Sequence, residues 1–448
     1  MMTNLVTMRA GELLAHGVGG RDDLPIPFTY AVTGAAMALV ASFLALGLLW
    51  REPRLDPARA GRPLPAGVAR VFDGPVVRGG LRVLGAVVTA YVVMAAVFGR
   101  DDALNPTAGV VYVLLWIGVP LLSVLVGPVW RLVSPLRSLH WLLSRVMGTR
   151  PEDGMAPLPP WLGYWPAALS LLAFVWLELV APQNTTLPVL RTFFAAYLAV
   201  HLLAATYWGS GWFARGDGFE VFSSLAGRLS PLGRRTDGTL VLRNPLVGVA
   251  GTPVAPGLFA VVGVLLGSTA YDSMAGSPWW VSALQSGPFS AEVTGTLGLL
   301  GLVALVTAAF TAAAALSGRG TGRPPLEVGG ELAHSIVPIV IGYVVAHYWS
   351  LLVLVGQQTV VQLSDPLGTG ADWLGTGGRG VDPSLADPTL VALIQVTAVV
   401  TGHVLGVVLA HDRAIALLPR RRAVTGQIPL LVLMICYTVG GLTLLFAA

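Results

Sequence analysis

Three histidines lie inside long apolar stretches of the sequence, where an ionisable side chain is costly and calls for an explanation. His201, His347 and His403 fall at comparable depths when residues are counted along those stretches, at about 1.5 Å of helix rise per residue. Neutral imidazole binds zinc, copper and iron, and three histidines around one open position form a known catalytic arrangement. The pattern allows a transition-metal centre held by His347, His403 and His201.

Two other interpretations of these histidines stay open. An imidazole inside a helical bundle also serves to hydrogen-bond a neighbouring helix, which is the simplest account of all three. A haem site or a proton relay is the third interpretation. No two of these histidines have the i, i+4 spacing of a helix-borne metal motif, so the metal hypothesis rests on depth alone.

Further polar residues could line a cavity inside the protein. Gln358 follows His347 by eleven residues, which places the two side chains about 20° apart around a helix. Polar groups on one face are expected to point into a bundle, because lipid cannot hydrogen-bond them. Glu178, Asp272 and Asp365 lie toward the same predicted side of the membrane and complete this expected polar cavity. Hydrogen bonding between helices is the equal alternative.

Composition places these residues in a membrane. The chain of 448 residues is 54% hydrophobic and only 11% charged, whereas a soluble protein needs a charged exterior. The lipid bilayer is therefore its expected partner. The 27 basic residues are all arginine and are spread over many connections, which excludes a basic patch for nucleic acid. The lack of lysine, beside abundant glycine and alanine, is typical of a GC-rich bacterial gene.

Hydropathy predicts an all-α polytopic bundle of about ten transmembrane helices, since a span needs roughly 20 apolar residues. Residues 28–448 are expected to form this single domain. Pro120 and Pro338 lie inside spans and predict kinks, whereas Pro166 and Pro188 lie at helix starts. The single cysteine, Cys436, excludes an intrachain disulfide. The predicted spans are 28–50, 80–99, 108–130, 164–181, 188–208, 253–272, 293–316, 335–358, 389–411 and 427–447.

Arginine placement predicts the orientation of the spans. Of the 27 arginines, 22 lie in alternate connections, which the positive-inside rule assigns to the cytoplasm. The protein is therefore expected in the cell's inner (plasma) membrane, with both ends outside. The segments 1–27 and 362–388 are then extracytoplasmic. The connections 51–79 and 209–252 are cytoplasmic and, being rich in Arg, Pro and Gly, are expected to be irregular.

Two short stretches of the cytoplasmic connections carry their own predictions. Residues 138–147 (SLHWLLSRVM) have an amphipathic pattern and are expected to lie flat on the membrane surface. Residues 215–220 (RGDGFE) are expected to form a turn that pins the connection to that surface. The short connection 182–187 predicts a tight helical hairpin between the fourth and fifth spans.

Short motifs, spread from the N-terminus to the last span, resemble those of the bacterial membrane proteins known as fenitrothion hydrolases. The chain departs from the family pattern at Asp22, where an aromatic residue is usual, and at Ser134, where asparagine is common. The motifs are Ala15-His16-Gly17 with Arg21 and Asp23, Asn105-Pro106, Gly127-Pro128-Val129-Trp130, Ser134-Pro135-Leu136-Arg137, Ala346-His347-Tyr348, Ser364-Asp365-Pro366-Leu367-Gly368, Gly402-His403 and Gln427-Ile428-Pro429.

The resemblance implies hydrolysis of a small lipophilic organophosphate or other ester, at or within the membrane. Such a reaction would use an activated water and a metal ion as Lewis acid, held by the histidines inside the spans. Two alternatives remain: a transporter or channel with a polar path through the bundle, and a non-catalytic subunit that docks a metal- or redox-handling partner. Transport would be favoured by inverted repeats and broken helices, and no clear repeat occurs in the sequence.

Overall fold

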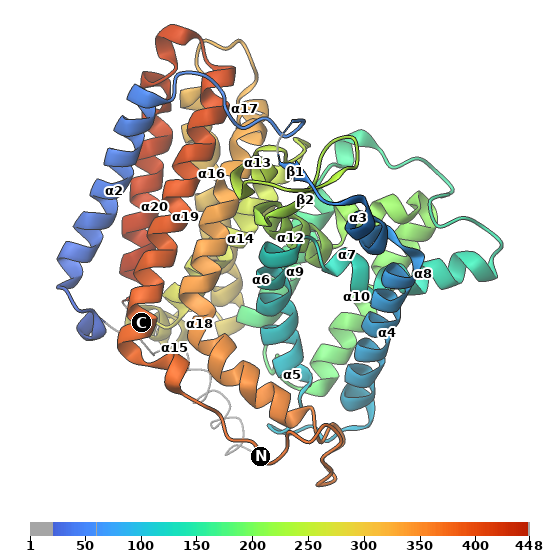
Figure 1. Ribbon diagram of the computed structural model, residues 1–448. Coiled ribbons are helices and arrows are strands. Elements are labelled where there is room, and N and C mark those ends of the chain that lie inside the picture. Colours follow the sequence, from blue (N-terminus) through green and yellow to red (C-terminus); the bar gives the residue numbers. More distant parts are fainter. Residues whose placement is uncertain (1–20, 60, 447–448) are drawn as a thin grey trace. The chain divides into compact units, whose positions relative to one another are not determined.

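The computed structural model describes residues 21–59 and 61–446, and it is mostly helical, with only three short strands in the described part (Figure 1). Ten helical segments of this part are long and apolar enough to cross a membrane. The chain is therefore an all-α multi-pass membrane protein, as predicted. The segments are α2 (Phe28–Leu49), α4 (Pro75–Phe98), α5 to α6 (Thr107–Val126), η3 to α9 (Pro160–Leu179), α10 (Leu187–Trp208), α14 (Leu258–Ala275), α16 (Ala291–Ser317), α17 to α18 (Pro325–Gln362), α19 (Pro388–Leu417) and η9 to α20 (Thr425–Leu445).

The described chain divides by its contacts into two compact units, which the sequence did not indicate. The first unit comprises 63–232 and 350–386, and it contains α4, α5, α6, α9 and α10. The second comprises 21–62, 233–349 and 387–446, and it contains α2, α14, α16, α17, α19 and α20. Helix α18 (Val337–Gln362) contributes its residues up to Trp349 to the second unit and the remainder to the first.

Prolines mark where helices start or change type. Pro166 and Pro188 fall in the first turns of α9 (Trp165–Leu179) and α10, as predicted. Pro120 follows a π-helical stretch, η2 (Val110–Gly118), and Pro338 follows a 3-10 turn, η6 (Ala333–Ile336). Both prolines thus lie just after a change of helix type, which fits the N–H that proline lacks, and the kinks themselves stay predictions.

The predicted hairpin between the fourth and fifth spans is present. Helix α9 ends at Leu179 and α10 begins at Leu187. In the turn, the Asn184 side-chain amide donates to the Glu178 carbonyl oxygen at 2.5 Å. Gln183 adopts a positive φ of 52°, which lets the chain reverse between the helices.

The prediction that 51–79 and 209–252 are irregular is wrong. They contain α3 (Ala66–Asp73), α11 (Phe213–Gly216), α12 (Gly218–Ala226) and α13 (Pro245–Ala250). They also contain three short strands in the order β1-β3-β2, namely β1 (Arg62–Pro63), β2 (Leu232–Arg234) and β3 (Leu240–Leu242). Asp217 and Asn244 start α12 and α13 by accepting a backbone N–H at the N-cap. Gly238, with a φ of 86°, supplies the turn between β2 and β3.

The two ends of the described chain meet within the second unit. The Arg21 Nε donates to the Phe446 carbonyl oxygen at 2.9 Å, and the Arg21 guanidinium stacks on the Phe28 ring at 4.7 Å. An even number of spans requires both ends on one side of the membrane, and this contact agrees with it. Which side that is, and which membrane holds the protein, remain predictions.

Helix α19 crosses η6 and the start of α18 within the second unit, at positions where only glycine fits. A Cβ atom at Gly402 would lie 2.6 Å from the Pro338 carbonyl oxygen. A Cβ at Gly406 would lie 2.8 Å from the Ser335 carbonyl oxygen. Both obstacles are backbone atoms, so a side chain at either position would have to push the two helices apart.

We therefore expect Gly402→Ala to destabilise the protein by about 1–3 kcal/mol, the usual effect of overpacking a tight interior. The matched control is Gly440→Ala in α20 (Ile428–Leu445), because a Cβ there meets no atom within 4 Å. The control should be neutral or slightly stabilising, since alanine is the better helix former. Unfolding of the two variants in detergent, by heat or by denaturant, measures the difference. Equal stability of the two would contradict the predicted crossing.

Candidate functional site

A chain of hydrogen bonds connects the last turns of α14 to α18 inside the second unit. Asp272 and Ser273 are adjacent residues of α14, and Ser273 is buried. Tyr343 and His347 lie four residues apart on α18 and therefore share one face of that helix. Tyr348 follows directly and is also buried. Asp272 and Ser273 of α14 thus both reach the His347 imidazole of α18.

The distances join these groups in a defined order. His347 Nε2 lies 2.9 Å from Asp272 Oδ2, and His347 Nδ1 lies 3.3 Å from Ser273 Oγ. The Tyr343 hydroxyl lies 2.6 Å from the same Ser273 Oγ. The Tyr348 hydroxyl donates to Asp272 Oδ2 at 2.7 Å. Asp272, His347, Ser273 and Tyr343 thus form one continuous hydrogen-bonded series.

One histidine tautomer satisfies the whole series. If Nε2 of His347 carries the proton, it donates to the Asp272 carboxylate, and Nδ1 accepts the Ser273 hydroxyl proton. The Tyr343 hydroxyl then donates to Ser273 Oγ. The result is a hydroxyl facing a base whose second nitrogen is held by a carboxylate. This is the relation between nucleophile, base and orienting group that defines catalytic triads on unrelated folds.

The surroundings hold the imidazole of His347 in one orientation. The Tyr343 ring stacks on it with centroids 5.9 Å apart, and the Tyr348 ring meets it edge-on at 4.7 Å. Ser273 is 2% exposed and His347 is 9% exposed, whereas the Asp272 side chain remains 13% exposed. Water is therefore nearly excluded from the hydroxyl, which strengthens electrostatic interactions at the site.

The described residues show no grouping of the kind expected for a centre of three histidines. In the second unit, His403 Nδ1 lies 2.9 Å from the Val399 carbonyl oxygen of its own helix. In the first unit, His201 Nδ1 accepts the indole N–H of Trp212 at 2.9 Å. Among residues 21–59 and 61–446, no three His, Cys, Asp or Glu side chains are grouped so that they could hold a metal ion. Each of these two histidines instead has a local hydrogen-bonding partner.

The residues of the expected polar cavity have separate surroundings. Asp272 joins His347, as described above. Gln358 is exposed and belongs to the part of α18 that lies in the first unit. The backbone carbonyl of Glu178 accepts the Asn184 side-chain N–H of the hairpin, and the Glu178 side chain is partly buried. Asp365 lies in the connection after α18, where backbone N–H groups of that connection lower the pKa of its carboxyl.

Of the N-terminal motif, the described part of the chain contains Arg21 and Asp23, and His16 lies outside it. Arg21 binds the Phe446 carbonyl at the other end of the described chain. Asp23 is partly buried. The two described residues belong to the second unit, where Arg21 connects the start of α2 to the end of α20.

Sequence reasoning missed Ser273 and Tyr343, and it noted Tyr348 only as part of the motif Ala346-His347-Tyr348. The spacing of Tyr343 and His347 was a usable signal, since hydroxyl and imidazole groups four residues apart share a helix face. The adjacent pair Asp272 and Ser273 at the end of a span was another. The missing information was that α14 faces α18, which hydropathy does not contain.

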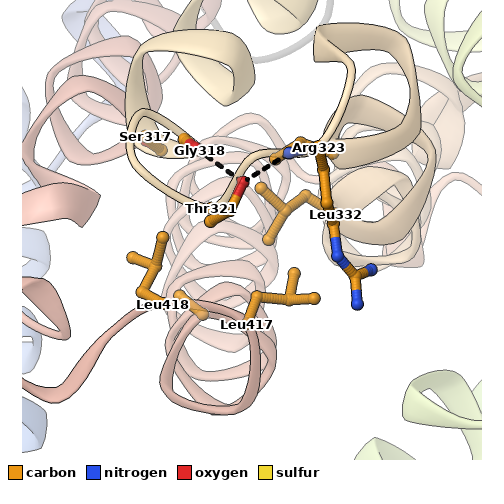
Figure 2. Close-up of a pocket in the computed structure, with 9 residues that line it drawn as sticks. Ser317, Gly318, Thr321, Arg323, Leu332, Leu417 and Leu418 are labelled. Carbon is orange, nitrogen blue, oxygen red and sulfur yellow. Dashed lines mark hydrogen bonds between the residues drawn. The ribbon is translucent and has the colours of Figure 1, made fainter.

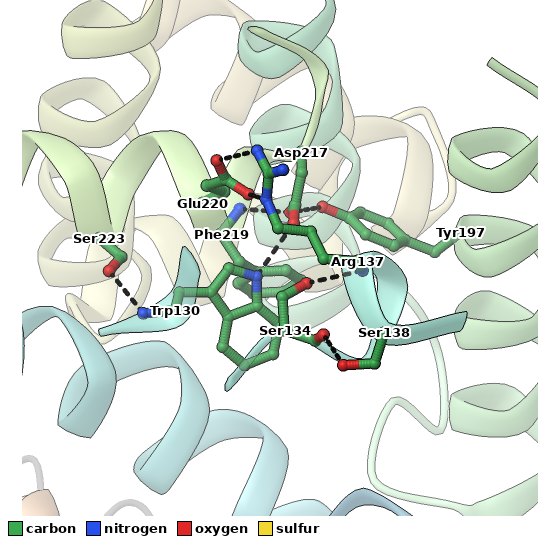
Figure 3. A network of polar contacts seen from close by, with 9 residues as sticks. All are labelled: Trp130, Ser134, Arg137, Ser138, Tyr197, Asp217, Phe219, Glu220 and Ser223. Carbon is green, nitrogen blue, oxygen red and sulfur yellow. Dashed lines mark hydrogen bonds and ion pairs between the residues drawn. The ribbon is translucent and has the colours of Figure 1, made fainter. Parts of the chain in front are cut away.

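A second polar network lies in the first unit and joins α8 (Pro135–Val146) to α12 (Figure 3). Arg137 binds Glu220 through two parallel hydrogen bonds of 2.5 and 2.6 Å. Glu220 is 1% exposed, and this burial raises the pKa of its carboxyl, while Arg137 opposes the rise. Such bidentate pairs are the strongest hydrogen bonds that side chains form.

The neighbouring carboxylate, Asp217, is surrounded by donors. It accepts the Trp130 indole N–H at 3.0 Å, the Tyr197 hydroxyl at 2.7 Å and the Phe219 backbone N–H at 3.0 Å. Burial still raises the pKa of Asp217 above its ordinary value. The stretch 215–220 was expected to pin its connection to the membrane surface. Asp217 and Glu220 fasten it to helices of the first unit (Figure 3), and its place relative to the membrane stays a prediction.

The amphipathic stretch 138–147 is helical, as α8. This helix buries Leu136 and His140 and exposes Leu142 and Val146. Burial lowers the pKa of His140. An exposed apolar face on such a helix is typical of one that lies in the membrane interface, so that location stays a prediction.

A shallow pocket in the second unit offers no comparable chemistry (Figure 2). Its empty space is about 280 Å³, part of which is open solvent. Thr321 organises one wall by donating to the Gly318 carbonyl and accepting the Arg323 backbone N–H. The described lining contains no histidine, cysteine or carboxylate that could act as base or nucleophile. The lining residues are Ser317, Gly318, Thr321, Arg323, Val328, Leu332, Ala414, Leu417 and Leu418.

No family model, no curated protein and no solved structure matches this chain. Its site has to be interpreted from the geometry of its own residues. Of the networks described above, the one around His347 places a hydroxyl, a base and a carboxylate in the order that catalysis by a nucleophile requires.

Proposed function

We propose that this membrane protein hydrolyses small lipophilic esters, with Ser273 as the nucleophile, His347 as the base and Asp272 as the orienting carboxylate. The observation that carries the proposal is the hydrogen-bonded series from Asp272 through His347 to Ser273. The resemblance to fenitrothion hydrolases supports the same reaction class. A side-chain nucleophile takes the place of the metal-activated water that the sequence suggested.

The reaction would proceed in two halves. Ser273 Oγ attacks the ester carbonyl carbon or phosphorus while its proton passes to His347 Nδ1, and Asp272 stabilises the imidazolium through Nε2–H. The leaving alkoxide or phenoxide takes that proton and departs as an alcohol or phenol, which leaves Ser273 esterified. A water molecule then attacks this ester and gives its proton to His347, which returns it to Ser273 Oγ as the acid is released.

Tyr343 supplies a further group for this chemistry. Its hydroxyl lies 2.6 Å from Ser273 Oγ, and it would turn to donate to the substrate oxygen on which negative charge develops during the attack. Donors that are already oriented in a site of low polarity contribute more to rate than they would in water. Tyr348, which donates to Asp272 at 2.7 Å, would hold the orienting carboxylate in position.

The proposed substrates are lipophilic because of where the hydroxyl lies. Ser273 is 2% exposed and belongs to α14. In the most apolar part of this span, 72% of the residues are buried inside the protein. A substrate must reach it by opening of the surrounding helices, and an ester that partitions into the bilayer is concentrated there. A polar or charged ester would lose hydration in that environment without compensation.

Covalent labelling tests the nucleophile directly. The purified protein in mild detergent is treated with a lipophilic fluorophosphonate, and the modified peptide is identified by mass spectrometry. We expect one label on Ser273, and none at that position in Ser273→Ala. The matched control is Ser268→Ala on the same helix, because Ser268 is equally buried but donates to the Leu265 carbonyl. This control should label as the wild type does.

Hydrolysis of p-nitrophenyl carboxylate and phosphate esters of increasing chain length gives a second readout. The wild type and Ser268→Ala should hydrolyse the more lipophilic esters, and Ser273→Ala should not. A folded wild type that neither takes the label nor hydrolyses these esters would overturn the proposal. Equal rates for Ser273→Ala and the wild type would overturn the role of Ser273.

The polar path of the transporter hypothesis gains no support from the described contacts. The imidazole of His201 bonds to Trp212, and that of His403 bonds to the preceding turn of its own helix. Gln358 is exposed. We therefore propose ester hydrolysis as the function, ahead of transport or docking.

A further inference from the structure

Helix α3 of the first unit exposes an apolar face. None of its 8 residues is buried. Val68, Val71 and Phe72 are 40%, 60% and 50% exposed, and their i, i+3 and i+4 spacing places them on one side of the helix. A helix this short is marginal in water, and helices in proteins gain most of their stability from packing an amphipathic face. The apolar side of α3 is therefore positioned to pack on a surface outside the described chain.

Helix α8 of the same unit exposes a second apolar stripe. One side of α8 is buried in the unit, as described above, and the other side carries apolar residues at i, i+3, i+4 and i+7 spacing. These exposed residues are Leu139 (40%), Leu142 (53%), Leu143 (41%) and Val146 (79%). Because the packing of α8 within the unit uses its other side, this stripe indicates a second contact surface.

Both helices adjoin the same end of α4. Helix α3 ends at Asp73, and α4 begins at Pro75. Helix α7 (Trp130–Val133), which precedes α8, packs closely on the first half of α4, where a Cβ atom at Gly85 would lie 2.9 Å from the Val133 Cα atom. Helices α3 and α8 each contact α4 as well (Figure 1). The two apolar stripes thus belong to one end of a single membrane-spanning helix.

The chain around these stripes is strongly basic. Residues 62–82, which include α3 and the start of α4, contain four arginines and one acidic residue, a net charge of +3. Residues 131–150, which include α8, contain four arginines and no acidic residue, and of these Arg137 is paired with Glu220. Exposed apolar side chains beside arginines are typical of helices that lie in the headgroup region of a membrane. Anionic lipid supplies the complementary charge for such a surface.

We propose that α3 and the exposed side of α8 form a binding surface for anionic lipid. Val71 and Phe72 enter the boundary between headgroups and acyl chains, and Arg70 and Arg82 contact lipid phosphates. Arginine suits this role because its long side chain extends past apolar surface and its guanidinium matches two phosphate oxygens. The surface lies in the first unit, so it does not depend on the ester hydrolysis proposed for residues of the second.

Fluorescent labelling of single cysteines tests which side of α3 contacts lipid. Cys436 is the only cysteine of the chain, so Cys436→Ser gives a background in which Val71→Cys or Ala66→Cys is labelled with a nitrobenzoxadiazole dye. Ala66 is also exposed and lies about 140° around the helix from Val71. In nanodiscs of phosphatidylcholine and phosphatidylglycerol, a nitroxide-labelled lipid should quench the dye strongly at position 71 and little at position 66. Equal quenching at the two positions, or quenching at neither, would overturn the proposal.

Amide hydrogen exchange tests the need for anionic lipid. Exchange in residues 66–73 should be slower by about tenfold or more with phosphatidylglycerol than in nanodiscs of phosphatidylcholine alone, because each arginine near an anionic surface adds roughly fivefold to binding. High salt should reduce this difference. The double variant Arg70→Gln with Arg82→Gln should lose it, whereas Arg191→Gln, at an exposed position of α10, should keep it. Equal exchange with and without phosphatidylglycerol, or an unchanged difference in the double variant, would contradict the proposed binding of anionic lipid.

Discussion

His347→Gln is expected to lower kcat/KM for lipophilic esters by about 10³-fold, within the range that loss of a general base produces. Glutamine can still donate a hydrogen bond to Asp272, so the link between α14 and α18 is kept. It cannot accept and carry the Ser273 proton. A factor of about 10³ corresponds to roughly 4 kcal/mol of transition-state stabilisation. Steady-state hydrolysis of the best p-nitrophenyl ester measures the change.

Two companion measurements distinguish catalysis from packing in this prediction. The melting temperature of His347→Gln should stay close to that of the wild type, because the substitution preserves the contact between the helices. Tyr348→Phe removes a donor to Asp272 and leaves His347 in place, so its loss of rate should be much smaller. A folded His347→Gln with wild-type kcat/KM would exclude His347 as the base.

Arg137→Ala is expected to destabilise the protein by about 3–5 kcal/mol, the effect of leaving a buried charge without its partner. The Arg137 side chain is 16% exposed and that of Glu220 is 1% exposed, so water cannot replace the lost guanidinium. Arg145→Ala on the same helix is the control. Arg145 is exposed and contacts the Trp141 ring at 4.8 Å, and its loss should cost about 1 kcal/mol or less. Denaturant unfolding in detergent measures both.

The pH dependence of Arg137→Ala identifies the cause. Burial already raises the pKa of Glu220, and Arg137 is what opposes that rise, so the variant should have a still higher pKa in the folded state. A carboxyl whose pKa is raised by folding loses stability as pH rises through that value. The destabilisation should therefore be smaller near about pH 5 than near about pH 8. Destabilisation independent of pH would indicate lost packing instead of an unpaired carboxylate.

The spans could be predicted because their physical cause is local. Each needs only a sufficient run of apolar residues, and that run is visible in the sequence without knowledge of its neighbours. The eighth span was predicted as 335–358, whereas α17, η6 and α18 together cover Pro325–Gln362. The prediction omitted α17, which contains the charged residues Glu327 and Glu331. Both pair with Arg323, and such a pairing cannot be inferred from hydropathy.

The candidate site could be predicted only in part, because it depends on which helix faces which. His347 and Asp272 were recognised separately, as ionisable groups at costly positions. Their pairing with each other and with Ser273 requires α14 and α18 to be neighbours. These two helices are separated in the chain by α16. The three-histidine hypothesis rested on similar depth in the membrane, and depth does not specify the direction in which a side chain points.

Helix α2 has a consequence for how the second unit is assembled during synthesis. It packs against α19 and α20 (Figure 1), yet roughly 340 residues separate its end at Leu49 from the start of α19 at Pro388. At about 5–20 residues per second, the first span waits in lipid for tens of seconds before its partners exist. Its buried face consists of Ala31, Ala35, Leu39 and Phe43. All four are apolar, so lipid can cover that face without leaving a polar group unsatisfied until the last helices displace it.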